Sequence, residues 1–156
     1  MTTNYAELIP GFPLFKGFTT DGANRLLNSG EVKQYGAGEV LLKEGDAADC
    51  VLLLLAGGLE VFVERDGKDL VLTETKPGTV VGELAVLCGI PRSASVRAQD
   101  SAAVLEWSDE AFRTLLLRDP HLSQRIFGQI LRTLVEKESA LIDSLITAQH
   151  FSQRSR

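Results

Sequence analysis

One acidic and one basic side chain stand in an otherwise uncharged segment, GELAVLCGIPRSASV, which runs from Gly82 to Val96. The guanidinium of Arg92 is a planar fork of donors that suits a phosphate. The carboxylate of Glu83 would be repelled by the same phosphate and is suited instead to accept from a hydroxyl, such as that of a ribose. A short helix starting near Gly82 would add unpaired backbone N–H groups that favour an anion, and a glycine lets the backbone come close to a ligand. Together these features predict a pocket for a small sugar phosphate of low charge.

The same two charged residues also have a simpler interpretation. Glu83 and Arg92 would then form a partly exposed ion pair that caps a turn. Such surface pairs are common and contribute little to stability. The spacing alone does not choose between the pocket and the ion pair.

The residues around this segment predict a β-rich region between helices. From residue 31 to residue 107, short apolar stretches alternate with glycine-bearing turns, as is typical of an antiparallel sandwich or barrel. The clearest hairpin is EVFVERDGKDLVLTE, with its turn at Asp66 and Gly67. Residues 1–30 predict short helices, and residues 108–150 predict C-terminal helices with Ser108 as the first N-cap. We therefore expect a single domain over residues 1–156 that is mostly β with flanking helices.

The last part of the chain predicts one long helix with an apolar heptad seam. Its seam positions, spaced alternately by four and three, are Phe127, Leu131, Leu134, Glu138, Leu141, Leu145 and Ala148. This seam predicts a homodimer whose helices pack side by side over residues 127–148. Glu138 is the one charged residue in it, and a carboxylate in a dimer core costs stability unless it has a partner. Glu138 therefore either faces a ligand or is solvated where the helices flare, and the adjacent Lys137 is the other candidate for a ligand contact.

Composition narrows the function classes. The net charge of -5 over 156 residues argues against a general nucleic-acid binder, and the longest apolar run is too short to span a bilayer. With no secretion signal at the N-terminus, the expected location is the cytoplasm.

Cys50 and Cys88 lie in apolar contexts and are predicted to be buried thiols. His121 and His150 both lie in the C-terminal helical region, so no metal site and no enzyme is expected.

The segment GELAVLCGIPRSASV resembles the phosphate-binding cassette of cyclic nucleotide-binding domains. That cassette reads Gly-Glu-Leu/Ile-Ala/Gly-Leu, a variable spacer, and then Pro-Arg-x-Ala-x-Val/Ile. The stretches GEVLLKEGDAADCVLLLLAGGLEVF and VLEWSDEAFRTLLLRDP add weaker similarity, although DAADCVLLLL departs from the usual pattern. The resemblance implies an eight-stranded jelly-roll-like β-roll flanked by helices, which binds a 3′,5′-cyclic nucleotide and needs no cofactor or metal.

The resemblance also implies roles for individual residues. The implied phosphate contacts are Arg92, Ser93, Ala94 and Ala85. The implied ribose contacts are Glu83, Gly82 and Leu84. The implied base contacts are Val71, Thr73 and Glu138, the last from the same or the other subunit.

Two further expectations concern the ligand and the output. Relatives that prefer cyclic GMP often have threonine after the cassette arginine, so Ser93 favours cyclic AMP, with a cyclic GMP-selective sensor as the alternative. A carboxylate over the base can accept from the adenine amine or from two guanine N–H groups. The sequence closes on QHFSQRSR without the helix-turn-helix of catabolite-activator-type transcription factors. We therefore expect a stand-alone sensor that does not contact DNA and acts on an unknown effector protein, or a ligand-free interaction module with the same fold.

Overall fold

A computed structural model describes residues 2–154, which divide into two compact units on either side of the Asp119–Pro120 bond. The first unit begins with α1 (Tyr5–Leu8), η1 (Ile9–Gly11), η2 (Pro13–Phe15) and α2 (Thr20–Asn28). Its strands are β1 (Glu31–Tyr35), β2 (Val40–Leu42), β3 (Cys50–Arg65), β4 (Lys68–Thr75), β5 (Val80–Val81) and β6 (Ser95–Ser108). The remaining helices are α3 (Glu83–Cys88) between β5 and β6, α4 (Asp109–Arg118) after β6, and α5 (Pro120–Arg154), which forms the second unit.

Two helices, α2 and α4, begin directly after a residue whose side chain caps the helix N-terminus. The hydroxyl of Thr19 accepts from the backbone N–H of Gly22 at the start of α2, at 3.1 Å. Ser108 does the same for Ala111 at the start of α4, also at 3.1 Å. Each cap satisfies one of the N–H groups that a first helical turn leaves unpaired. The predicted N-cap at Ser108 is confirmed.

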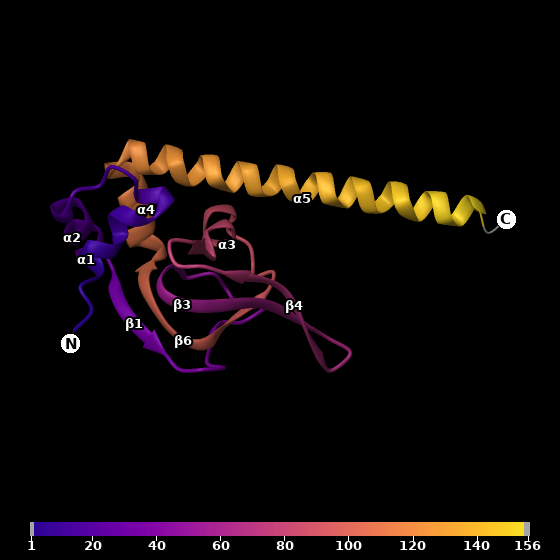
Figure 1. The fold of residues 1–156 in the computed structure, drawn as a ribbon, viewed down its shortest axis with the longest axis horizontal. Helices are drawn as coiled ribbons and strands as arrows, with labels where there is room; N and C mark the ends of the chain where they lie inside the picture. The colour runs from indigo at the N-terminus through magenta and orange to yellow at the C-terminus, as the bar shows by residue number, and fades with distance from the viewer. Residues whose placement is uncertain (1, 155–156) are drawn as a thin grey trace. The chain divides into compact units, whose positions relative to one another are not determined.

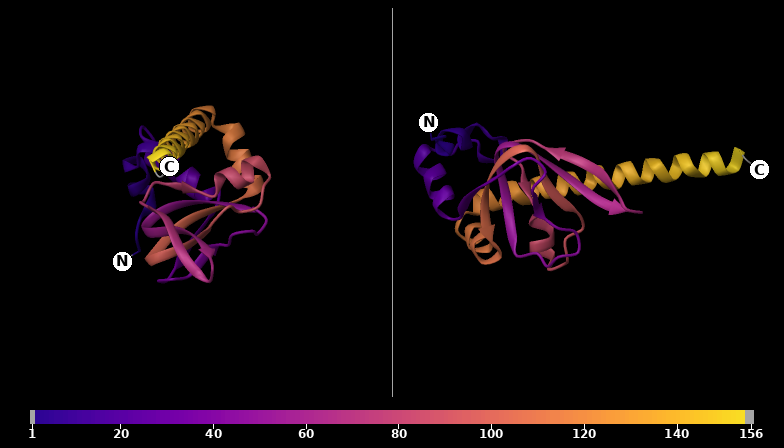
Figure 2. Two further views of the ribbon diagram at one scale, coloured as in Figure 1. Left: turned by 90° about the vertical axis from the view of Figure 1, so that its right-hand side faces the viewer. Right: turned by 90° about the horizontal axis from the view of Figure 1, so that it is seen from below.

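The strands form one antiparallel sheet in the order β1-β6-β3-β4, with β2 paired to β6 and β5 paired to β3 (Figure 1). The predicted β-roll with flanking helices is confirmed, but the described residues form six strands where eight were expected. The difference arises because β3 and β6 stay paired from Cys50↔Ser108 to Phe62↔Ser95. The pairing of these two long strands passes through two register shifts, and both strands curve through the roll (Figure 2).

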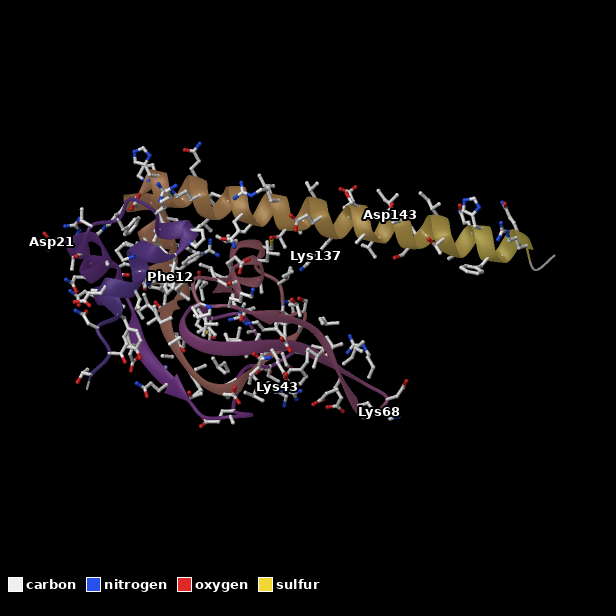
Figure 3. All side chains as sticks on the ribbon, in the orientation of Figure 1. Phe12, Asp21, Lys43, Lys68, Lys137 and Asp143 are labelled. Carbon is white, nitrogen blue, oxygen red and sulfur yellow. The ribbon has the colours of Figure 1, made fainter. Side chains whose placement is uncertain are left out.

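The hairpin between β3 and β4 turns at Asp66 and Gly67, as predicted. Both residues have positive φ, 54° and 73°, which is the backbone that a two-residue turn needs to match the twist of its strands. Lys68 marks the first residue of β4 at this turn (Figure 3). β4 is an edge strand, and almost all of its residues are exposed.

Apolar residues from four strands, β2, β3, β5 and β6, fill the interior of the roll. The cluster consists of Leu42, Leu52, Leu54, Leu59, Val81, Val96, Ala98, Ala102 and Val104. At the other end of β6, the buried Trp107 packs against Phe112 of α4, with ring centroids 5.8 Å apart, and its Nε1 donates to the Ser29 hydroxyl at 2.8 Å. The burial of these side chains fixes β6 against α2 and α4.

The second unit is the single helix α5. Large apolar side chains of the predicted seam are exposed on it: Leu131 at 62%, Leu141 at 66% and Leu145 at 64%. A row of exposed leucines at heptad spacing is what a helix-pairing surface requires. Within residues 2–154, no helix combines the length and apolar character needed to cross a bilayer.

A candidate phosphate-binding site around α3

The site is organised by α3, a short helix bounded by two glycines. Gly82 precedes it in the left-handed region at φ 83°, and Gly89 closes it in the same region at φ 64°. Ala85 and Val86 face the interior and are buried. The short helix expected from Glu83 to Cys88 is confirmed, and its first-turn N–H groups lie directly after Gly82.

Arg92 is a buried arginine that is held by main-chain oxygens. Its side chain and backbone together are only 5% exposed. Nη1 donates to the carbonyl oxygen of Gly82 at 2.7 Å, and Nη2 donates to that of Cys50 at 2.6 Å. Nη2 also lies 3.6 Å from the Cys50 sulfur. These bonds orient the guanidinium, and because the two carbonyls are neutral they do not cancel its charge.

Gly82 and Arg92 fit together sterically. A Cβ placed on Gly82 would lie 2.6 Å from Nη1 of Arg92 and 3.1 Å from a methyl carbon of Leu42. The positive φ of Gly82 would also strain any other residue. The glycine that precedes α3 therefore makes room for the side chain of Arg92, ten residues later in the chain.

The structure brings most of the implied phosphate and ribose residues onto two adjoining segments. Gly82, Glu83, Leu84 and Ala85 lie at the start of α3. Arg92, Ser93 and Ala94 lie in the turn that leads into β6. Glu83 and Leu84 are half-buried, Ser93 is exposed and Ala94 is half-buried. The individual contacts that the resemblance implies for these residues remain predictions.

The two base-lining candidates on β4 lie on opposite faces of the hairpin. Val71 pairs with Phe62, whereas Thr73 pairs with Val61, because a register shift places Leu72 as an extra residue. Neighbouring residues on β3 point to opposite faces, so their partners on β4 do as well. Val61 packs against the interior cluster. Thr73 therefore shares the inner face of the roll, and Val71 shares the face of Phe62.

Glu138 and Lys137, the candidates for covering the base, lie on α5 in the second unit, where Figure 3 labels Lys137. Both are exposed. Their role over a base remains a prediction.

Three features near the cassette were not predicted: a partner of Arg92, the burial of Ser95 and the surroundings of Arg97. The carbonyl oxygen of Cys50 accepts a hydrogen bond from the guanidinium of Arg92. The side chain of Ser95 is buried, with 8% of the residue exposed. Arg97 lies over the Phe62 ring, 4.2 Å from its centroid, and Nε donates to the Glu60 carboxylate at 2.8 Å. The sequence holds a signal only for Ser95 and Arg97: polar and apolar residues alternate in SASVR, as is typical of a strand.

The cysteines correct one prediction. Both are free, but Cys88 is exposed and Cys50 is half-buried, so the expectation of two buried thiols is wrong for Cys88. Cys88 is the last residue of α3, and the helix turns it away from the interior just before Gly89. Burial, and next the charge of Glu106, raise the pKa of the Cys50 thiol to about 11, which keeps the thiol neutral at ordinary pH. Among residues 2–154, no cluster of three or more His, Cys, Asp or Glu side chains could hold a metal ion.

Comparisons with known proteins agree with this geometry. The family model of the cyclic nucleotide-binding domain matches residues 32–119. A potassium channel of Oryza sativa subsp. japonica is 30% identical over 115 residues, which cover 73% of this chain and 13% of the channel. A cAMP-dependent protein kinase regulatory subunit of Blastocladiella emersonii is 29% identical over 133 residues, which cover 85% of this chain and 32% of the subunit.

A solved structure shares the same architecture. The catabolite activator protein of Thermus thermophilus superposes with a TM-score of 0.74 at 25% identity, covering 83% of this chain and 61% of that one. The chain thus spans less than two thirds of each of these three relatives. The family match over residues 32–119 starts at the second residue of β1 and includes all elements from β2 to α3 and the buried Arg92 after them. The chain belongs to the cyclic nucleotide-binding domain family.

Proposed function

We propose that this domain is a non-enzymatic sensor that binds 3′,5′-cyclic AMP in preference to cyclic GMP. The observation that carries the proposal is the buried guanidinium of Arg92, which the carbonyl oxygens of Gly82 and Cys50 orient at the start of α3. A buried charge held by neutral groups is stabilised when an anion binds beside it. The N–H groups at the start of α3 add donors for the same anion.

The ribose and the base follow from the neighbouring residues. Glu83, in the first turn of α3, accepts from the ribose 2′-hydroxyl, and Leu84 lies near the sugar. Ala85, Ser93 and Ala94 contribute backbone groups to the phosphate. The preference for cyclic AMP is supported by Ser93 after the arginine and by the similarity to the regulatory subunit of Blastocladiella emersonii, whose name refers to cAMP. Cyclic GMP is the alternative ligand, which a carboxylate over the base would also accommodate.

The output proceeds through the C-terminal helices. In this proposal two copies pair through the seam of α5 in the cytoplasm, and a base contact from Glu138 gives the bound state its extra affinity. A conformational change needs such a differential interaction between its two states. The effector is a separate protein or a further part of a longer chain.

Isothermal titration calorimetry with cyclic AMP and cyclic GMP tests the ligand. Arg92→Ala should weaken cyclic AMP binding by about 2–5 kcal/mol, the cost of stripping a buried charge pair of one partner. Arg118→Ala, which removes an exposed arginine of α4, is the charge-matched control and should bind like the wild type. Arg92→Lys keeps the charge but loses the fork, so it should fall between the two. A wild-type protein that binds neither nucleotide would favour the alternative of a ligand-free interaction module.

Glu138 is tested separately from the phosphate site. Glu138→Ala should lower the affinity for cyclic AMP and change its ratio to cyclic GMP, and Lys137→Ala, the adjacent exposed residue, serves as the comparison. Unchanged affinity and unchanged selectivity in Glu138→Ala would remove this residue from the binding site. An effect confined to Lys137→Ala would assign the contact to the lysine.

A further inference from the structure

The buried polar side chains of the described residues are Arg92 and Ser95, and they lie three positions apart, 95 minus 92, in one segment. Arg92 has the phosphate role proposed above, whereas Ser95 was not among the residues that the cassette pattern implies. A buried hydroxyl costs free energy unless it is hydrogen-bonded. The partner of Ser95 therefore shows what the residue is for.

That partner lies in the loop after β2. The Ser95 hydroxyl accepts from the backbone N–H of Glu44 at 2.9 Å. The same loop exchanges two backbone hydrogen bonds with Arg92: Gly45 donates to the Arg92 carbonyl at 2.9 Å, and Arg92 donates to the Asp46 carbonyl at 2.9 Å. Lys43 marks this loop in Figure 3. The loop thus holds the main chain of the phosphate arginine as well as Ser95.

The two paired segments have unequal lengths between their fixed points. The pairing of β2 with β6, which has a register shift between Val40 and Leu42, ends at Leu42↔Val96, and the next backbone hydrogen bond joins Gly45 to Arg92. Residues 43–44 lie between these points on one side, and residues 93–95 lie between them on the other. The longer side has one residue too many to stay flat, as in a β-bulge. The chain bends at residues 93 and 94, where this extra length is taken up, and we call these two residues the 93–94 arch.

We propose that Ser95 is a positioning residue that fixes the second end of the 93–94 arch, while the backbone of Arg92 fixes the first. This inference rests on the proposed function, in which the arch carries backbone groups for the phosphate. Without the hydroxyl, the N–H of Glu44 has no acceptor at this point, and the arch is joined to the loop at one end only. Ser95 acts from behind the arch: it pairs with Phe62, on the opposite face from Val96 and the interior cluster.

A first experiment measures the hydrogen bond between the Glu44 N–H and the Ser95 hydroxyl in the absence of ligand. Amide hydrogen exchange of Glu44, followed by NMR, should be about tenfold faster in Ser95→Ala than in the wild type, because the donor loses its acceptor. Ser95→Thr keeps the hydroxyl and should restore slow exchange. Ser101→Ala removes an exposed hydroxyl of β6 and should change nothing at Glu44. Equal Glu44 exchange in Ser95→Ala and the wild type would overturn the proposal.

A second experiment measures cyclic AMP binding by calorimetry in the same variants. Ser95→Ala should raise the dissociation constant about tenfold, Ser95→Thr should stay close to the wild type, and Ser101→Ala should match it. A double-mutant cycle with Arg92→Lys then separates positioning from general destabilisation. If Ser95 acts through the arch, the loss caused by Arg92→Lys should be smaller in the Ser95→Ala background, whereas additive losses would contradict the proposal.

The two experiments distinguish a failure of the proposed function from a failure of the role proposed for Ser95. Wild-type protein that binds neither cyclic AMP nor cyclic GMP defeats the proposed function, whatever Glu44 exchange shows. Normal wild-type binding with unaltered affinity in Ser95→Ala defeats the role of Ser95 alone. Should Ser95→Ala not fold, Ser95→Cys retains the side-chain volume with a weak acceptor and takes its place in both measurements.

Discussion

The guanidinium of Arg113 in α4 donates a hydrogen bond of 2.6 Å to the carbonyl oxygen of Val86 in α3. Asp109, one turn earlier in α4, pairs with the same guanidinium. The last carbonyls of a helix lack partners within it and carry its partial negative charge. Arg113 therefore completes the end of the cassette helix and joins it directly to α4.

Arg113→Met should uncouple α4 from the cassette with little loss of binding. The chain has one tryptophan, Trp107, whose ring packs against Phe112 next to Arg113, so its fluorescence reports on α4. We expect cyclic AMP to alter the emission of the wild type and to alter that of Arg113→Met much less. The dissociation constant should stay within about tenfold, since one hydrogen bond contributes about 0.5–1.5 kcal/mol.

Arg118→Met, at the exposed end of α4, is the matched control for this measurement and should behave as the wild type. An equal ligand-induced emission change in Arg113→Met and in the wild type would show that the bond does not connect the two helices. So would a wild type that binds cyclic AMP without any change at Trp107.

The split of Val71 and Thr73 between the two faces of the hairpin predicts unequal effects on binding. Thr73→Ala should weaken cyclic AMP binding about three- to tenfold, the size of one hydrogen bond, because Thr73 shares the inner face with Val61. Val71→Ala should bind nearly as the wild type, since Val71 pairs with Phe62 on the other face. Calorimetry on both variants decides the matter, and the reverse order of effects would assign the base contact to Val71.

The two thiols should differ in reactivity. Cys50 lines a cavity of about 500 Å³ with Asp49 and Glu106, and its pKa is raised to about 11. Since the thiolate is the reactive form, Cys50 should react slowly with a disulfide reagent at pH 8 and faster as the pH rises toward 11. Cys88 is exposed and should react first.

Variants that keep only one of the two cysteines show which thiol gives the fast reaction and which gives the slow one. Cys50→Ser retains the fast reaction and Cys88→Ser retains the slow one.

The high pKa of Cys50 also means that the folded protein holds the thiol proton of Cys50 more tightly than the unfolded chain does. The contribution of Cys50 to stability is therefore present below about pH 9 and declines as the pH rises through 11. Rapid labelling of Cys88→Ser at pH 8 would contradict this assignment.

The seam of α5 predicts a dimer that a single charge disrupts. Leu141, 66% exposed, should be covered by the partner helix, so Leu141→Glu should shift the mass measured by sedimentation equilibrium from dimer to monomer. Thr133→Glu adds the same charge off the seam and should leave the dimer intact. A monomer at every concentration in the wild type, with and without cyclic AMP, would refute the pairing.

Local sequence signals predicted the elements that depend on nearby residues. The Asp66-Gly67 turn, the Ser108 cap and the short helix after Gly82 each follow from a few adjacent side chains, and the structure has them all. The charged pair of the cassette also marked two segments that the structure brings together. The residues predicted to contact phosphate and ribose lie on these segments, which meet at Gly82 and Arg92.

Features set by pairing across the sheet were not predictable in the same way. The extra residue at Leu72 depends on the register between β3 and β4, and it separates two side chains that plain alternation would place together. The burial and hydrogen bond of Ser95, and so the role proposed for it, depend on a loop that ends 49 residues earlier, at Asp46. Arg92 was expected to face either a phosphate or Glu83, and the carbonyl of Cys50 is a partner that no pattern of side chains reveals.

The close fit of Gly82 against Arg92 suggests how to disrupt the proposed binding site without altering the charge of the protein. A single methyl group at position 82 would overlap Nη1 at 2.6 Å and displace the guanidinium from its seat. Gly82→Ala would thus preserve every ionisable group of the molecule and still displace the guanidinium from the proposed phosphate site. In cells, such a variant would separate any effect of ligand binding from effects that need only the presence of the protein.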